Sequence, residues 1–195
     1  MAPNVKDCLL FPDYRDIVKE KISKKMVKKM KKDYLATPEL PAKRVCDSEI
    51  EQVQPVFKAH LNSQNRLFGG QLVAWIDIVA GAVARRHCNH NVTTAVIDSL
   101  QFKEPVFPDD VVVLYGRMTY VGKTSMEVRV DSYVEALDGN RKLVNTAYLV
   151  LVALDENGKP TPVPRLICET PAEKAEWEAG EKRRQLRAKR RTEMF

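Results

Sequence analysis

The stretch from Gln71 to Arg86 constrains the fold most, because its apolar residues cover nearly every face of a helix. These residues are Leu72, Val73, Trp75, Ile76, Ile78, Val79, Ala80, Ala82, Val83 and Ala84. A helix that is apolar all round is a buried helix. The sequence therefore predicts a fold built around one central helix, which the chain enters through Gly69 and Gly70.

Strand-like runs flank this helix, one weak run before it and four after it. They are residues 45–57, 92–102, 111–121, 125–134 and 143–155. In 125–134 apolar and polar residues alternate, which predicts one face in solvent. The last run is apolar on both faces, so we expect it in the middle of the sheet. Because short turns separate the later runs, consecutive strands are expected to pair antiparallel.

The economical packing of these elements wraps one antiparallel sheet around the apolar helix, which is an α+β architecture of the hot-dog type. We expect this domain to occupy residues 45–166. Basic residues gather outside it, at 19–32 and 182–191, and account for much of the net charge of +6.

Both ends of the chain are predicted to be helical. The extension 1–44 contains a basic amphipathic pattern over 14–35, which suits a membrane-surface or partner-binding arm. A solvated or subunit-packing extension is the favoured interpretation. After Pro164, the segment 167–195 is rich in Glu, Lys and Arg. We interpret it as an exposed helix with a solvated charged face rather than a nucleic-acid interface.

The composition favours a cytoplasmic protein. No stretch is long and uncharged enough to span a bilayer, and Pro12 and Asp13 interrupt the N-terminal apolar residues that a secretory signal would need. The four cysteines lack the spacing of metal ligands or of a disulfide scaffold, which fits reduced thiols. His87, Cys88 and His90 match no usual zinc spacing, so we expect no metal.

Asp77 is the single ionisable side chain between Gly70 and Ala84. Carboxylates are rarely buried without a reason, and one in an apolar setting suits a general base or nucleophile. The alternative is an aspartate that caps or bridges a dimer interface, and residue type alone does not choose between the two.

The glycine pair lets a ligand approach the backbone and leaves the first helical amides free for a developing oxyanion, although a tight turn explains it equally well. Asn62, in the polar loop before the helix, suits holding water or a carbonyl group. Gln64 and Asn65 suit this as well.

Spacing adds a constraint, because Gly70 and Asp77 lie nearly two helical turns apart, about 10 Å along one face. One helix cannot bring both groups to one reacting carbonyl. Two antiparallel helices related by a two-fold axis can pair them across subunits. We therefore predict composite sites at a dimer interface.

The turn from Tyr120 to Ser125 combines a flexible glycine, a lysine and two hydroxyl groups between two predicted strands. Such a turn suits contacts to a diphosphate group or to pantetheine. An ordinary hairpin turn is the alternative.

Residues 62–86, which read NSQNRLFGGQLVAWIDIVAGAVARR, resemble the acyl-CoA thioesterase branch of the hot-dog proteins, which includes the brain-type cytosolic acyl-CoA hydrolases. The resemblance continues through VTTAVIDSLQFKEPV, YVGKTSMEV and PVPRL, and covers the chain from about Val45 to the C-terminal helix. It implies hydrolysis of acyl-CoA to CoA and a free fatty acid.

The resemblance also implies roles for individual residues. Asn62 and Asp77 would act together from opposite sides of an interface, with the Gly70 amide stabilising the oxyanion. Contacts to CoA would involve Gly69, Thr94, Ala95, Val96, Lys123, Thr124 and Ser125. No metal or organic cofactor would be required.

Brain-type enzymes contain two hot-dog domains in tandem, whereas this chain has length for one. A homodimer would replace the tandem, and the family suggests a hexamer formed as a trimer of dimers.

Two other functions fit the same fold. A hydratase or dehydratase acting on acyl-CoA or an acyl carrier needs a suitably placed histidine, but the helix has none before His87. A non-catalytic acyl-CoA sensor needs neither Asn62 nor Asp77, and both are present.

Overall fold

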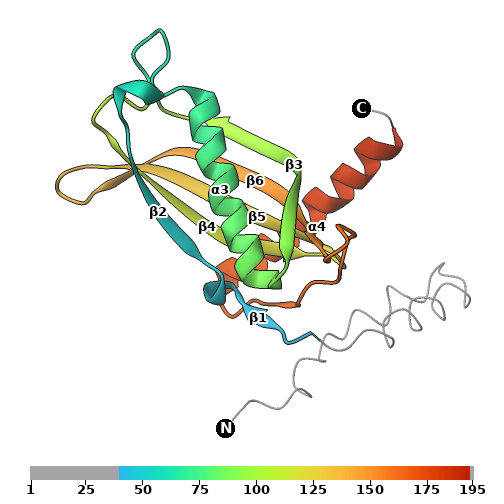
Figure 1. Ribbon diagram of the computed structural model, residues 1–195. Coiled ribbons are helices and arrows are strands. Elements are labelled where there is room, and N and C mark those ends of the chain that lie inside the picture. The colour runs from blue at the N-terminus through green and yellow to red at the C-terminus, as the bar shows by residue number, and fades with distance from the viewer. Residues whose placement is uncertain (1–39, 194–195) are drawn as a thin grey trace, which may run out of the picture. The chain divides into compact units, whose positions relative to one another are not determined.

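The predicted central helix is present as α3, Gly69–Cys88, and lies across one face of a five-stranded sheet (Figure 1). The computed structural model describes residues 40–193, so the predicted helix over 14–35 lies outside the described residues. The glycine pair forms the first turn of α3 rather than preceding it. Asn89, with a left-handed φ of 57°, ends the helix as its C-cap.

The sheet has the order β2-β4-β5-β6-β3, and every neighbouring pair is antiparallel. Its strands are β2 (Ile50–Pro55), β3 (Asn91–Phe102), β4 (Val111–Val121), β5 (Ser125–Glu135) and β6 (Arg141–Leu154). The predicted architecture is thus confirmed, including the internal position of β6. A separate parallel pair joins β1 (Lys43–Arg44) to β7 (Leu166–Ile167).

Two details of the strand prediction are wrong. β3 pairs with β6 instead of its successor β4, because residues 103–110 form a connection long enough to carry the chain across the sheet. The weak run at 45–57 is a strand only over β2. It begins as a 3₁₀ helix, η2 (Val45–Asp47), and a second one, η3 (Lys58–His60), follows β2.

The core lies between α3 and the sheet, where Leu72, Ile76, Val79 and Val83 are buried. At Gly116 on β4 the helix comes so close that a Cβ atom would lie 2.6 Å from the side chain of Val79.

The prediction that α3 is buried on every face is wrong for one strip. Ala74 is exposed, Ile78 is 59% exposed, and Asp77 and Gly81 are half-buried beside them. The described chain therefore leaves a largely apolar surface open along this helix.

The C-terminal helix α4, Pro171–Thr192, begins behind the sheet, on the face opposite α3 (Figure 1). Gly180 is buried there against Tyr120 and Glu127. Most residues of α4 are exposed, as predicted, although the helix packs on the sheet around Gly180. The prediction of a wet face on β5 is wrong, since Glu127 and Asp131 are each only 1% exposed.

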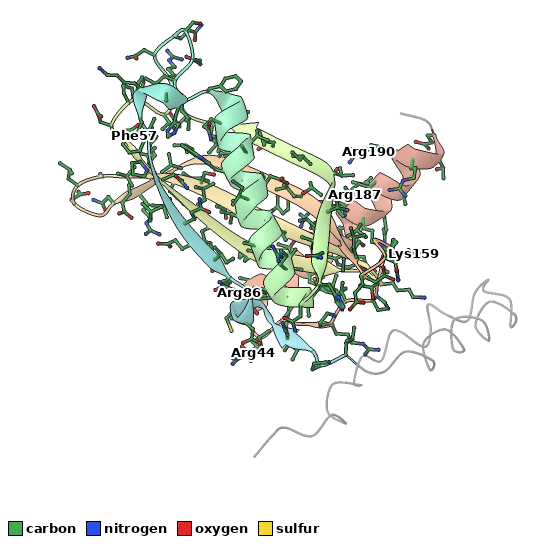
Figure 2. All side chains as sticks on the ribbon, viewed as in Figure 1. Arg44, Phe57, Arg86, Lys159, Arg187 and Arg190 are labelled. Atoms are coloured by element: carbon green, nitrogen blue, oxygen red, sulfur yellow. The ribbon has the colours of Figure 1, made fainter. Side chains whose placement is uncertain are left out.

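Charged groups of opposite sign hold α4 to the sheet. Arg183 and Arg187 each lie 2.8 Å from a carboxylate oxygen of Glu127, and Arg187 lies 2.7 Å from Asp98 on β3. Arg190, one turn beyond Arg187 on the same helix (Figure 2), lies 3.4 Å from Asp98. Charges of opposite sign can be buried together when they pair. The polar face of β5, which was predicted to lie in solvent, is therefore buried under α4.

Candidate active site

Asp77 and Thr94 are brought together by α3 and β3. Thr94 pairs with Leu151 of the core, so its side chain points to the helix side of the sheet. There Thr94 Oγ1 donates a 2.6 Å hydrogen bond to Asp77 Oδ1. Within the described part of the chain the second carboxylate oxygen of Asp77 has no partner, so it is available to a water molecule or a substrate.

The strand that carries Thr94 is irregular. Its pairing with β6 shifts between Thr94 and Val96 and again between Ile97 and Ser99, which leaves Ala95 and Asp98 as the extra residues. Bulges re-aim the side chains around them. Ala95 is exposed and Val96 is half-buried, and both directly follow Thr94 in the chain.

The start of α3 offers unpaired backbone donors. The first helical bonds run from Gln71 N and Leu72 N to Phe68 O, at 2.9 and 3.2 Å. Among the described residues, the N–H groups of Gly69 and Gly70 have no hydrogen-bond partner, and Phe68 provides no side-chain cap. Free amides at the positive end of a helix dipole suit a developing oxyanion.

Aromatic rings surround these two amides. A Cβ atom on Gly70 would lie 2.5 Å from the Phe68 ring, and one on Gly69 would lie 3.3 Å from the Phe102 ring. Only glycine leaves both rings in place. The pair is therefore more than a flexible turn, because it makes room for an apolar lining beside the free donors.

Asn62 lies in a tight loop closed by a bridge between Leu61 and Leu67, just before α3 begins at Gly69. Its Oδ1 accepts hydrogen bonds from Gln64 N at 2.9 Å and Arg66 N at 3.2 Å. The side-chain amide nitrogen is thereby left as a donor. This distinguishes Asn62 from Asn65, which is exposed and has a left-handed φ of 56°.

The turn between β4 and β5 is a tight hairpin in which Gly122 N donates to Ser125 O at 2.7 Å. The carbonyl oxygens of Lys123 and Thr124 accept hydrogen bonds from Val163 N and Ala153 N, and within residues 40–193 neither side chain has a hydrogen-bond partner. Ser125 pairs with Val152, which pairs with Thr93. The turn therefore lies two strands, about 10 Å, from the strand that carries Thr94.

The predicted site residues thus form three separate groups within one chain. Asn62, Gly69 and Gly70 lie at the start of α3, Asp77 meets Thr94 near its middle, and the hairpin lies at the far end of the sheet. The bond between Thr94 and Asp77 was not predicted, because it depends on the pairing of β3 with β6.

His87 and its neighbours do not converge. His87 is fully buried and its Nε2 lies 3.1 Å from Pro164 O, while Cys88 contacts the carbonyl oxygen of His90. Burial lowers the pKa of His87. In the region 40–193 no three His, Cys, Asp or Glu side chains form a metal site. No helix in that region is long and apolar enough to cross a membrane.

Comparison with known proteins agrees with this geometry. Residues 64–137 match the thioesterase superfamily. An uncharacterized acyl-CoA thioester hydrolase of Bacillus subtilis is 44% identical over 137 residues, which are 69% of this chain and 80% of that protein. The cytosolic acyl coenzyme A thioester hydrolase of Rattus norvegicus is 39% identical over 63% of this chain. The match spans 33% of that longer protein.

Solved structures share the fold. The acyl-CoA hydrolase of Staphylococcus aureus in complex with butyryl coenzyme A, coenzyme A and coenzyme A disulfide is 33% identical, with a TM-score of 0.75 over 79% of this chain and 94% of that one. An apo-hexameric acyl-CoA thioesterase is 38% identical, with a TM-score of 0.74 over 77% of this chain and 97% of that one.

The Staphylococcus aureus enzyme has also been solved as single alanine variants of an asparagine, an aspartate and a threonine. Along that chain the aspartate follows the asparagine by 15 residues and the threonine follows the aspartate by 17. Asn62, Asp77 and Thr94 have the same spacing here. On these sequence and structural similarities together, the chain belongs to the acyl-CoA thioesterase family of hot-dog proteins.

Proposed function

We propose that this protein hydrolyses acyl-CoA thioesters to CoA and a free carboxylic acid. The observation that carries the proposal is the carboxylate of Asp77, held by Thr94 with one oxygen left open. Relatives named as acyl-CoA thioester hydrolases support the choice of substrate. The same spacing of Asn, Asp and Thr in the Staphylococcus aureus enzyme supports the choice of residues.

In the proposed reaction Asp77 takes a proton from water while the water oxygen adds to the thioester carbonyl carbon. The C–S bond then breaks, and the sulfur takes the proton from Asp77 and leaves as the CoA thiol. Direct attack by Asp77 would instead form an anhydride that water hydrolyses. Both routes need the same carboxylate, and neither requires a metal or organic cofactor, so activity should survive dialysis against a chelator.

The carbonyl oxygen becomes negative in this reaction, and the Gly70 N–H is the donor that we assign to it. We assign Asn62 to the same oxygen rather than to the water. Its free group is an N–H donor, and donating to the attacking water would occupy a lone pair that the attack needs.

We further propose that the groups meet across a homodimer, with three dimers in a hexamer. The open strip of α3 and the unpaired edge of β3, where Ile97 is 42% exposed, offer one continuous surface for a second copy. A two-fold axis there would set Gly70 of one α3 near Asp77 of the other. The hexameric thioesterases among the structural neighbours support an oligomer.

We also propose a cytoplasmic location. The scattered cysteines and the cytosolic hydrolases among the relatives support it.

The first test measures free CoA released from a series of acyl-CoA substrates with a thiol-reactive dye. Asp77→Asn keeps the shape of the side chain and should lower turnover by roughly 10²–10⁴-fold. Asp109→Asn, an exposed aspartate in a left-handed conformation that Asn tolerates, is the matched control. Full turnover by Asp77→Asn would refute the mechanism, and a wild-type protein that binds CoA but releases none would be a sensor.

The second test mixes inactive Asn62→Ala and Asp77→Ala subunits under conditions of proven subunit exchange. Half of the dimers are then mixed, and each mixed dimer regains one of its two sites. About a quarter of the wild-type activity should return. No recovery would place both residues in one subunit's site.

A further inference from the structure

Arg184 of α4 differs from Arg183 and Arg187, which lie on either side of it along the helix, in having no carboxylate partner within the described residues. Arg183, Arg187 and Arg190 all pair with Glu127 or Asp98. Within residues 40–193, Arg184 contacts no acid and instead reaches the hairpin between β4 and β5. Its Nη1 lies 3.4 Å from Tyr120 Oη.

The hairpin brings a second donor close to this guanidinium. At Gly122 the place of a missing Cβ atom is 2.8 Å from Ser125 Oγ and 3.9 Å from Arg184 Nε. A side chain at position 122 would fill the space between the hydroxyl group and the guanidinium. Glycine avoids this clash, so the hydroxyl group and the guanidinium lie close to the same point of the hairpin.

The chemistry of this space suits a phosphate group. Lys123 in the same turn is exposed and, in the part of the chain that the structure describes, has no acidic partner. A guanidinium, an ammonium and a hydroxyl group all donate hydrogen bonds, and two of them are cationic. Charge-assisted bonds to phosphate oxygens are among the stronger hydrogen bonds in proteins.

We infer that Arg184, with Lys123 and Ser125, binds a phosphate group of the CoA substrate and thereby selects CoA thioesters over smaller ones. The inference rests on the proposed function. It adds a residue from α4, which lies outside the segment 64–137 that matches the superfamily. The phosphates of CoA are separated from its thioester by the pantetheine arm, as the hairpin is separated from Asp77 by two strands.

The test compares Arg184→Gln with two other variants of the full-length protein. Lys182→Gln removes the same charge about 200° around the same helix, away from the hairpin, and is the control. Arg184→Lys restores the charge. We expect Arg184→Gln to raise the KM for acyl-CoA about tenfold with kcat unchanged, Lys182→Gln to match the wild type, and Arg184→Lys to recover most of the loss.

A thioester without phosphates separates phosphate binding from a general loss of structure. Hydrolysis of an acyl N-acetylcysteamine thioester should be equal in the wild type and in Arg184→Gln. An equal defect on both substrates, or no defect on acyl-CoA, would overturn the inference.

Direct titration with CoA and dephospho-CoA gives a readout that needs no turnover. A loss of affinity for CoA alone would assign Arg184 to the 3′-phosphate, and a loss for both would assign it to the diphosphate. Equal CoA affinity of Arg184→Gln and wild type would refute the site. If the wild type binds CoA through Arg184 but hydrolyses no thioester, the proposed function fails and the phosphate site stands.

Discussion

At the scale of single residues, the position of Asp77 depends on a partner 17 residues further along the chain. The hydrogen bond from Thr94 fixes one carboxylate oxygen, and the other has no partner among the described residues. Such a threonine needs no contact with the substrate to matter, because it fixes the direction in which Asp77 attacks or accepts a proton.

Replacing Thr94 with valine removes this hydrogen bond and keeps the shape of the side chain. We expect kcat to fall about tenfold with KM unchanged, because the binding groups remain while the carboxylate loses its orientation. Thr94→Ser retains the hydroxyl group and should keep most of the activity. Steady-state kinetics of CoA release measures all three, and a rise in KM alone would show that Thr94 contacts CoA instead.

The sequence identifies Asp77 because it is the one ionisable group in an apolar helix. The same reasoning could not identify the function of Thr94. Its contact follows from the register of β3 against β6 and from a bulge at Ala95, and neither is encoded in the local pattern of β3. Resemblance placed Thr94 in the site, and the register supplies its partner.

Stability should depend on pH through His87. Burial lowers the pKa of this ring from its ordinary 6.5, and its Nδ1 has no partner within residues 40–193. The unfolded chain therefore takes up a proton before the folded one does. The contribution of His87 to stability is fully present above pH 6.5 and is lost as the pH falls below it.

Urea unfolding between about pH 7.5 and 5.5 checks this, since His87→Gln retains a donor for Pro164 O but cannot titrate. We expect a shallower fall in the unfolding free energy for His87→Gln than for the wild type. His90→Gln, at an exposed site, is the control. Equal slopes for His87→Gln and the wild type would mean that another group is responsible.

At the scale of elements, the sequence predicts the sheet strands, the central helix and a C-terminal helix, but it does not predict the attachment of α4 to the sheet. Periodicity finds α3 and the four strands after it because each buries a regular apolar face. The inner face of α4 instead carries arginines that pair with buried acids, beside Trp177 and Gly180. A single-residue hydrophobicity pattern cannot reveal burial by charge pairing.

Gly180 tests how closely α4 packs. In a free helix Gly→Ala stabilises by about 1 kcal/mol. Here the new Cβ atom would lie 2.7 Å from Tyr120 Cβ and 3.0 Å from Glu127 Oε1. We expect Gly180→Ala to lower the free energy of unfolding by about 1–3 kcal/mol, because the helix must move away from the strand.

Ala188→Gly lies at an exposed site of α4 and measures the effect of helix propensity alone. It should lower the free energy of unfolding by about 1 kcal/mol. Urea unfolding monitored by circular dichroism measures both variants. A stabilised Gly180→Ala would show that α4 is loosely attached.

At the scale of the whole molecule, the open strip on α3 tests the proposed assembly. Ile78 is 59% exposed in the single chain, so Ile78→Lys should fold normally. If the strip joins two copies, burying this lysine is costly and the oligomer dissociates. We expect light scattering after size-exclusion chromatography to give a smaller particle, with loss of hydrolysis. Leu186→Lys, 55% exposed on α4, is the control.

An Ile78→Lys protein that stays oligomeric and active would refute the interface on α3. The sequence indicated such an interface from the distance between Gly70 and Asp77 along one helix. It could not indicate which strand lies at the edge, because the pairing of β3 with β6 crosses the order of the chain.

The order of the sheet also limits how copies can join. Its two outer strands differ: β2 has six residues, ends at Pro55 and exposes Glu51, whereas β3 has twelve residues and, in the described chain, pairs with β6 on one side and with no strand on the other. Short edges with proline and charge resist the addition of another strand. Another strand can therefore be added to the sheet only at β3. If two copies pair through β3, the combined sheet has β2 at both of its edges. Because β2 resists strand addition, edge-to-edge pairing of sheets ends at two copies, and this protects the fold against fibrous aggregation.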